Sequence, residues 1–239
     1  MNDRLLGNWP NFDQIEIPLN DIAQQLGANS KEQASLELIE SIIWFKKLDE
    51  SSLKRINITS LDESIAHDNT EINILVVKLH AQQIPYEFLA LVDKSNDKFF
   101  IFLCYYQGRY CLLAHHKKPI LGQDQSNLTN TVTSSWLTAE QIKLDIQGSS
   151  ISHAYLNCLE QIYHGPTTIS SEHEVSIEEL LRNEARLTEL QQQLSKCQKQ
   201  KRKERQPNKK YQLHSQEQQL TKQISKIESF LSQHKHAHS

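Results

Sequence analysis

The spacing of hydrophobic and polar positions near the start of the chain predicts two helices. Asn20 or Asp21 caps a short helix that ends at Gly27. A capping pair, Ser30 and Gln33, then opens a second helix that extends through residue 48. The apolar positions of this second helix recur every three to five residues and comprise Ile39, Ile42, Ile43 and Leu48, joined by Trp44 and Phe45. We therefore expect it to have a broad buried face in the core.

In the middle of the chain the helical spacing gives way to short apolar runs that are rich in β-branched and aromatic residues. These runs predict strands over residues 71–79, 86–93, 99–106 and 110–116. Short polar segments of turn composition separate the last three runs, which predicts an antiparallel meander entered at Pro85. A polar loop and another strand, over residues 131–137, follow it. Apolar positions from 151 to 162 at helical spacing then predict a helix that ends at Gly165 and Pro166.

The last third of the chain has the spacing of paired helices. A polar linker, residues 167–175, precedes Ser176 and Glu179, which form a capping-box pattern. Beyond it the apolar positions recur at the intervals of a coiled coil; they are Leu187, Leu190, Leu194 and Cys197, then Leu213, Leu220, Ile224, Ile227 and Leu231. Pro207 lies between the two sets and predicts a break, because proline inside a helix costs about 3 kcal/mol. The second helix should fold back on the first, although an opposing chain in a dimer could fill the same seam.

Together these patterns predict an α+β fold in two parts. Residues 1–171 form an α+β globular domain, in which an antiparallel β-meander packs with helices. Residues 172–239 form a C-terminal helical hairpin or coiled-coil arm with a basic tip and a flexible, histidine-containing tail. We interpret metal binding by His234, His236 and His238 of that tail as incidental, because nothing encloses them.

Charge separates the same two parts. The formal net charge of −3 combines an acidic body, with 13 Lys or Arg against 20 Asp or Glu up to residue 171, and a basic remainder, with 13 against 9. The four cysteines have neither zinc-ligand nor paired spacing, which favours reduced thiols. The first residues lack the order of a signal peptide and no apolar run reaches membrane-spanning length. We therefore expect a cytoplasmic protein with no membrane contact.

The positive charge of the arm is concentrated at the predicted turn. Eight cations lie there beside a single acid, Glu204, and they are Lys196, Lys199, Lys201, Arg202, Lys203, Arg205, Lys209 and Lys210. Such a cluster attracts phosphates, and with Tyr211 as its one aromatic neighbour it should contact nucleic-acid backbone without reading sequence. An acidic patch on a protein partner is an alternative target. The plainer interpretation is a solvated helix tip that tolerates any charge.

Three short motifs carry a family resemblance. Their positions are Ile42, Trp44, Lys47 and Leu48, then Ile84, Pro85 and Leu89, then Gln206, Asn208 and Lys209. With them the chain, over roughly residues 36–231, resembles an uncharacterised bacterial group, the domain of unknown function family 4391. Pro207 stands where that pattern has an aromatic residue, so the broken arm need not be shared by other members. The resemblance implies no established activity, but genes of the group tend to lie beside helicases and DNA methyltransferases of restriction-like, phage-defence loci.

The sequence lacks the motifs of the enzymes that such a setting suggests. Metal-dependent nucleases use an Asp or Glu followed two positions later by Lys. No Asp or Glu of this chain has a Lys at that position. A phosphate-binding loop, a nucleophile elbow and a zinc-binding helix are also missing. We therefore assign no catalytic residues, no metal and no cofactor.

Two other groups of polar residues have plain interpretations. The polar end of the meander, where His115, His116, Lys117 and Lys118 could reach solvent, is interpreted as an ordinary strand end. Lys46 and Lys47 are expected to be exposed on one turn of the second helix.

The resulting hypothesis is a noncatalytic accessory protein of a bacterial restriction-like or phage-defence system. It would bind a larger partner of the helicase or methyltransferase type, and nucleic-acid backbone through its basic arm, with a homodimer through the arm as a further option. A divergent metal-dependent nuclease is the first alternative, and a structural oligomerisation protein is the second.

Overall fold

The structure, a computed structural model, describes residues 15–49, 71–119, 126–142, 144–148, 150–165 and 175–235. The chain divides into two compact units, Met1–Ser171 and Glu172–Ser239. The predicted linker lies largely outside the described residues, and so do His236 and His238 of the predicted tail.

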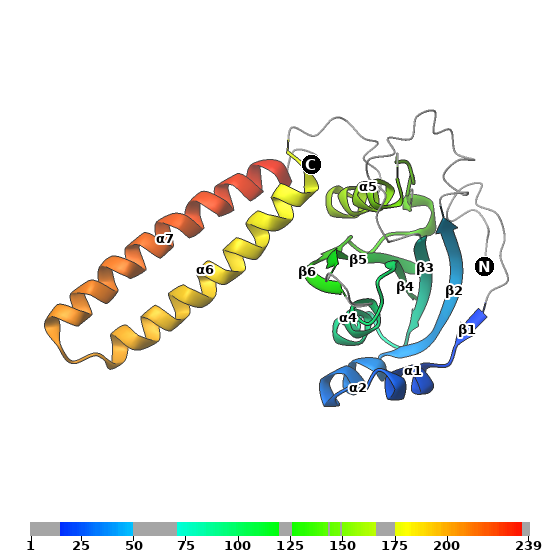
Figure 1. The fold of residues 1–239 in the computed structure, drawn as a ribbon, viewed down its shortest axis with the longest axis horizontal. Helices are drawn as coiled ribbons and strands as arrows, with labels where there is room; N and C mark the ends of the chain where they lie inside the picture. The colour runs from blue at the N-terminus through cyan, green and yellow to red at the C-terminus, as the bar shows by residue number, and fades with distance from the viewer. Residues whose placement is uncertain are drawn as a thin grey trace. The chain divides into compact units, whose positions relative to one another are not determined.

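One mixed sheet forms the centre of the first unit, and its strands lie side by side in the order of the sequence (Figure 1). The strands are β1 (Ile15–Ile17), β2 (Ile39–Asp49), β3 (Glu71–Leu79), β4 (Phe99–Tyr106), β5 (Arg109–Pro119) and β6 (Ser126–Thr133). Neighbouring strands are antiparallel except β3 and β4, which are parallel. A parallel pair needs a crossover connection, and helix α4 (Tyr86–Lys94) supplies it.

Helices cover both faces of this sheet (Figure 1). On one face lie α4 and the short helices α1 (Leu19–Gln25) and α2 (Ser30–Leu36), and side chains of all three contribute to one apolar cluster with the sheet. Helix α5 (Ile151–His164) covers the other face, where Tyr155 stacks on Phe99 with ring centroids 4.2 Å apart. A short 3-10 helix, η2 (Ala139–Gln141), precedes α5. These layers confirm the predicted α+β class.

The predicted second helix is wrong over most of its length. The helix ends at Leu36, its N-terminal cap is Asn29 with Glu32 rather than Ser30 with Gln33, and residues 39–49 form strand β2. Two register shifts interrupt the pairing of β2 with β3, at Ile39/Ser41 and at Trp44/Lys46. Each bulge adds a residue to the strand and breaks the alternation of buried and exposed positions. The resulting spacing of apolar residues resembles that of a helix.

The strand predicted over residues 86–93 is also wrong, because these residues form helix α4. Phe88, Leu89 and Val92 face the core at helical spacing. Pro85 precedes the helix and offers no side-chain cap, but the Ser35 hydroxyl of α2 accepts a hydrogen bond from the Phe88 N–H at 3.3 Å. The meander therefore shrinks to the hairpin of β4 and β5, extended by β6.

Several local predictions are confirmed. The β4–β5 turn places Gln107 and Gly108 at φ of 43° and 80°, as a tight hairpin requires. Helix α5 ends at Gly165, as expected. The strand expected over residues 131–137 is confirmed in part, since β6 ends at Thr133 and Leu137 forms only an isolated bridge with Tyr110.

The second unit is a hairpin of two long helices, α6 (Ile177–Lys203) and α7 (Pro207–Lys235). Ser176 caps α6, and its hydroxyl accepts a hydrogen bond from the Glu179 N–H at 3.3 Å. The two helices pack through a narrow apolar seam of Leu187, Leu190, Leu194, Cys197, Leu213, Leu220, Ile224 and Ile227. The predicted fold-back within one chain is thereby confirmed, with the break before Pro207.

Candidate nucleic-acid interface

The structure gathers the eight predicted cations around the turn of the hairpin. The last turns of α6 carry five of them: Lys196, Lys199, Lys201, Arg202 and Lys203. Arg205 lies in the turn, and Lys209 and Lys210 lie on the first turn of α7. All are exposed except Lys201, which is partly buried. We call these eight cations the basic tip.

The turn itself follows from the local sequence. Helix α6 ends where Glu204 adopts an extended conformation, with φ of −73° and ψ of 128°. Proline disfavours a helical conformation in the residue before it and is well suited to a helix start, so Gln206 and Pro207 separate the two helices and begin the second.

The single acid of the basic tip is engaged inside the turn. The Glu204 carboxylate accepts a hydrogen bond from the Gln206 N–H at 2.8 Å. This bond, a second one from the Arg205 N–H and the nearby charge of Lys209 hold the pKa of Glu204 below its ordinary value. Glu204 therefore stays ionised and stabilises the turn, and its charge offsets only part of the surrounding positive charge.

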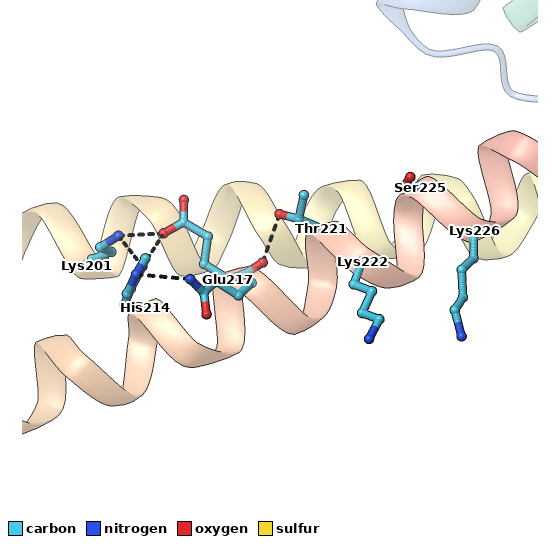
Figure 2. Close-up of a pocket in the computed structure, with 8 residues that line it drawn as sticks. Lys201, His214, Glu217, Thr221, Lys222, Ser225 and Lys226 are labelled. Atoms are coloured by element: carbon cyan, nitrogen blue, oxygen red, sulfur yellow. Dashed lines mark hydrogen bonds and ion pairs between the residues drawn. The ribbon is translucent and has the colours of Figure 1, made fainter.

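Lys201 differs from the other seven cations because it is bound within the hairpin. Its Nζ lies 2.6 Å from Glu217 Oε2 and 3.1 Å from His214 Nδ1 of α7 (Figure 2). Gln198 also donates to Glu217, at 3.1 Å. The hydrogen bond from Lys201 is the main reason that the pKa of Glu217 is lowered. A buried or partly buried polar pair in a helical seam favours one register, so Lys201 helps to align the two helices.

Further cations lie along α7 and were not among the predicted site residues. Lys222 and Lys226 are exposed and line a shallow depression with Gln218, Ser225 and other polar side chains (Figure 2). Figure 2 shows both lysine side chains directed away from α6. Their spacing of four residues on a helix was the available sequence signal, because such residues share a face.

In the first unit, charged side chains are buried beside the start of β4 and the end of β5. Asp93 of α4 has no exposed surface, its Oδ2 lies 2.7 Å from His115 Nδ1, and its Oδ1 lies 2.5 Å from Lys117 Nζ. The Lys117 ammonium also donates to the backbone carbonyls of Asn96 and Lys98. Burial lowers the pKa of Lys117, and the charge of Asp93 opposes that shift.

The expected solvent access of this strand end is therefore wrong for two of its residues. His115 is 1% exposed and Lys117 is 7% exposed, whereas His116 is partly exposed and the Lys118 side chain lies outside the described part. The sequence did not indicate this cluster, because Asp93 lies on a segment that was expected to be a strand. A helix instead carries it across the sheet face to β5.

A second buried carboxylate lies at the same end of the strands. Glu71, at the start of β3, forms ion pairs with Lys47 and with Lys98, the latter at 2.6 Å, and Asn73 donates to it at 3.3 Å. Burial alone would raise the pKa of Glu71, but these hydrogen bonds outweigh it and the pKa is lowered. Lys47 is exposed, as expected, although on a strand.

The predicted solvent exposure of Lys46 is wrong. It is 2% exposed rather than solvated, and burial lowers its pKa to about 8. Successive side chains of a strand point to opposite faces of the sheet, which explains why Lys46 is buried while its neighbour Lys47 is exposed.

The buried carboxylates of the described residues pair with basic side chains and do not gather into a metal-binding group. Within the described residues, no three His, Cys, Asp or Glu side chains gather where they could hold a metal ion. Burial also raises the pKa of the Cys111 thiol, which disfavours the reactive thiolate. The chemistry that the exposed side chains support best is electrostatic binding of anions at the basic tip.

Comparison with known proteins gives a family but no further relative. None of the helices in the described ranges combines the length and apolar composition of a membrane span. No curated protein matches the chain, and no solved structure matches it. One family model, described as Domain of unknown function (DUF4391), matches residues 11–224 and so covers most of the chain, including the sheet, α6, the first part of α7 and the basic tip. The chain therefore belongs to the DUF4391 family.

Proposed function

We propose that this protein is a noncatalytic accessory protein that binds the phosphate backbone of nucleic acid through its basic tip. The observation that carries the proposal is the local charge balance at the hairpin turn. Seven cations of the basic tip are exposed, while the one acid among them, Glu204, is hydrogen-bonded within the turn. Exposed cations without nearby acids bind phosphates by releasing counterions.

The hairpin is well suited to present these charges. Its apolar seam is closed within the chain, and the Lys201–Glu217 pair fixes the alignment of the two helices near the turn. The cations are therefore held on a preformed helical surface, and little of their binding free energy is lost to ordering the backbone. Contacts of this kind are made with phosphate groups and carry little sequence information.

The proposed setting is a bacterial restriction-like or phage-defence system, in the cytoplasm. The family resemblance supports it, because genes of the group tend to lie beside helicases and DNA methyltransferases. In that setting the protein would dock on a helicase or methyltransferase-type partner and bring the basic tip to its nucleic acid. Affinity capture from the native host, with and without nuclease treatment, tests for such a partner. Recovery of a helicase or methyltransferase that survives nuclease treatment is the expected result.

The decisive experiment measures nucleic-acid affinity as a function of salt. The triple variant Arg202→Gln/Lys203→Gln/Arg205→Gln removes three exposed charges and leaves Lys201 in its ion pair. We expect the slope of log affinity against log salt to fall in magnitude by about 2 to 3 units, because each lost phosphate contact removes about 0.9. A matched control, Lys31→Gln/Lys94→Gln/Arg109→Gln, removes three exposed charges from the first unit. It should leave the slope unchanged.

Three results would contradict the proposal. Equal losses in the tip variant and the control would mean that net charge alone attracts nucleic acid. Metal-dependent cleavage of the probe would favour the divergent nuclease. If neither binding nor cleavage occurs and the molecular mass in solution changes on removal of residues 172–239, a structural oligomerisation protein is the better explanation.

A further inference from the structure

One aromatic side chain of the hairpin remains in solvent next to the basic tip. Tyr211, on the first turns of α7, is 75% exposed, and it is the one large hydrophobic side chain of the described hairpin with such exposure. The seam residues Leu213 and Leu220 are two and nine positions further on, which places them on the opposite side of the helix. Tyr211 therefore contributes nothing to the packing of α6 against α7.

The face of α7 that carries Tyr211 continues as a polar and cationic strip. Positions 7, 11 and 15 residues after Tyr211 lie within about 60° of it around the helix, since each residue turns about 100°. They are Gln218, Lys222 and Lys226, and all three are exposed. The strip from Tyr211 to Lys226 is about 22 Å long at 1.5 Å per residue. We call it the α7 strip.

The α7 strip carries no negative charge. The acids of α7 are Glu217 and Glu228, and both lie more than about 90° from Tyr211 around the helix. Glu217 is also held by Lys201 at 2.6 Å. The shallow depression that Lys222 and Lys226 border is also lined by His214, Ser225 and Glu217, whose carboxylate is engaged by Lys201 (Figure 2). The strip thus pairs one exposed ring with cations and hydrogen-bond donors beyond it.

This combination distinguishes between forms of nucleic acid. In a duplex the faces of the bases are stacked on one another, so an exposed tyrosine ring gains little from it. In a single strand the faces are available, and stacking of a base on an aromatic side chain favours binding without regard to sequence. Lysines further along the strip would then contact the phosphates of adjoining nucleotides.

We propose that the α7 strip binds single-stranded nucleic acid, with a base stacked on Tyr211 and the phosphates of the adjoining nucleotides near Lys222 and Lys226. This inference rests on the proposed function and makes it more specific. It assigns the basic tip to general attraction of phosphates, and the α7 strip to selection of strands whose bases are unpaired.

The test compares labelled single strands with a duplex of the same length. The probes are oligothymidylate and oligouridylate of about 16 nucleotides, longer than the strip, and a blunt DNA duplex. We expect Tyr211→Ala to weaken single-strand binding about tenfold and duplex binding less than twofold. Tyr211→Phe keeps the ring and should restore nearly full affinity. Lys222→Gln/Lys226→Gln should reduce the salt slope on single strands by about 1.4 units.

The outcomes separate this inference from the proposed function. If the tip variant loses affinity but Tyr211→Ala has equal effects on single strands and duplex, the α7 strip is not a single-strand site, although the basic tip still binds backbone. If no probe binds the unchanged protein, both proposals are wrong. A preference for either single strand over the duplex that Tyr211→Ala abolishes and Tyr211→Phe keeps supports the single-strand site.

Discussion

The two units of this protein treat charge in opposite ways. In the first unit Asp93 and Glu71 are buried, and each is neutralised by two basic side chains. In the hairpin the cations of the basic tip are exposed, and the nearby acids Glu204 and Glu217 are engaged in the turn and the seam. Charge stabilises contacts between elements in the first unit, whereas in the hairpin it remains available to a partner.

The difference shows why counts of charged residues are a poor guide to function here. His115 and Lys117 stand in a conspicuous polar run, yet both are buried and contact one carboxylate, that of Asp93. Lys203 and Arg205 stand in an equally conspicuous run and are exposed. Three further experiments test this difference in the use of charge, in addition to the binding experiments on the basic tip and the α7 strip.

The largest expected effect comes from Asp93. Asp93→Asn leaves the Lys117 ammonium buried without its counter-charge, which should lower the free energy of unfolding by about 3–5 kcal/mol. Denaturant unfolding followed by circular dichroism measures it. Glu87→Gln is the matched control, because Glu87 is an exposed acid of the same helix. A loss as small as that of the control would show that the buried cluster does not stabilise the first unit.

A smaller effect concerns Lys46 and is seen through pH. Because the folded-state pKa of Lys46 is lowered to about 8, the unfolded chain binds more protons between that pH and the ordinary value near 10.5. Stability contributed through Lys46 should therefore rise with pH over this window. The stability difference between the wild type and Lys46→Met should change in that direction from pH 8 to 9.5. Lys31→Met, at an exposed lysine, provides the baseline, and an identical pH profile in the two variants would refute the prediction.

The smallest effect is expected in the hairpin seam. Lys201→Gln and Glu217→Gln, combined in a double-mutant cycle, should give only a small favourable coupling, because both side chains are partly exposed to solvent. Thermal unfolding measures the coupling. Glu217→Gln should also strengthen nucleic-acid binding at low salt, since it releases one cation. Weaker binding by this variant would mean that alignment of the helices matters more than the added charge.

The hairpin was predictable from sequence because its determinants are local. Heptad spacing, the Ser176 cap and the break before Pro207 each act within a few residues and agree with one another. The positions of the basic tip follow directly, because they lie on either side of that break. The α+β class was predictable for a similar reason, since most apolar runs of the body are strands of ordinary length.

The details of the first unit depend on contacts between distant residues. Residues 39–49 and 86–94 each had a spacing that fitted either a helix or a strand, and tertiary packing decided between them. The bulges of β2 and the Ser35 cap on α4 arise from partners about 30 to 50 residues away. The Asp93–His115 pair joins α4 to β5 across 22 residues of sequence, so no local pattern could have indicated it.

The order of the strands has a consequence for how the protein is made. From β1 to β6 each strand pairs with the one synthesised just before it, so the sheet can grow in step with translation. The parallel pairing of β4 with β3 is expected to form later, because α4 must first dock on the nascent sheet to reverse the path of the chain. We expect ribosome-bound chains that stop before residue 86 to be poorly protected from proteases, and those that include β5 to be resistant.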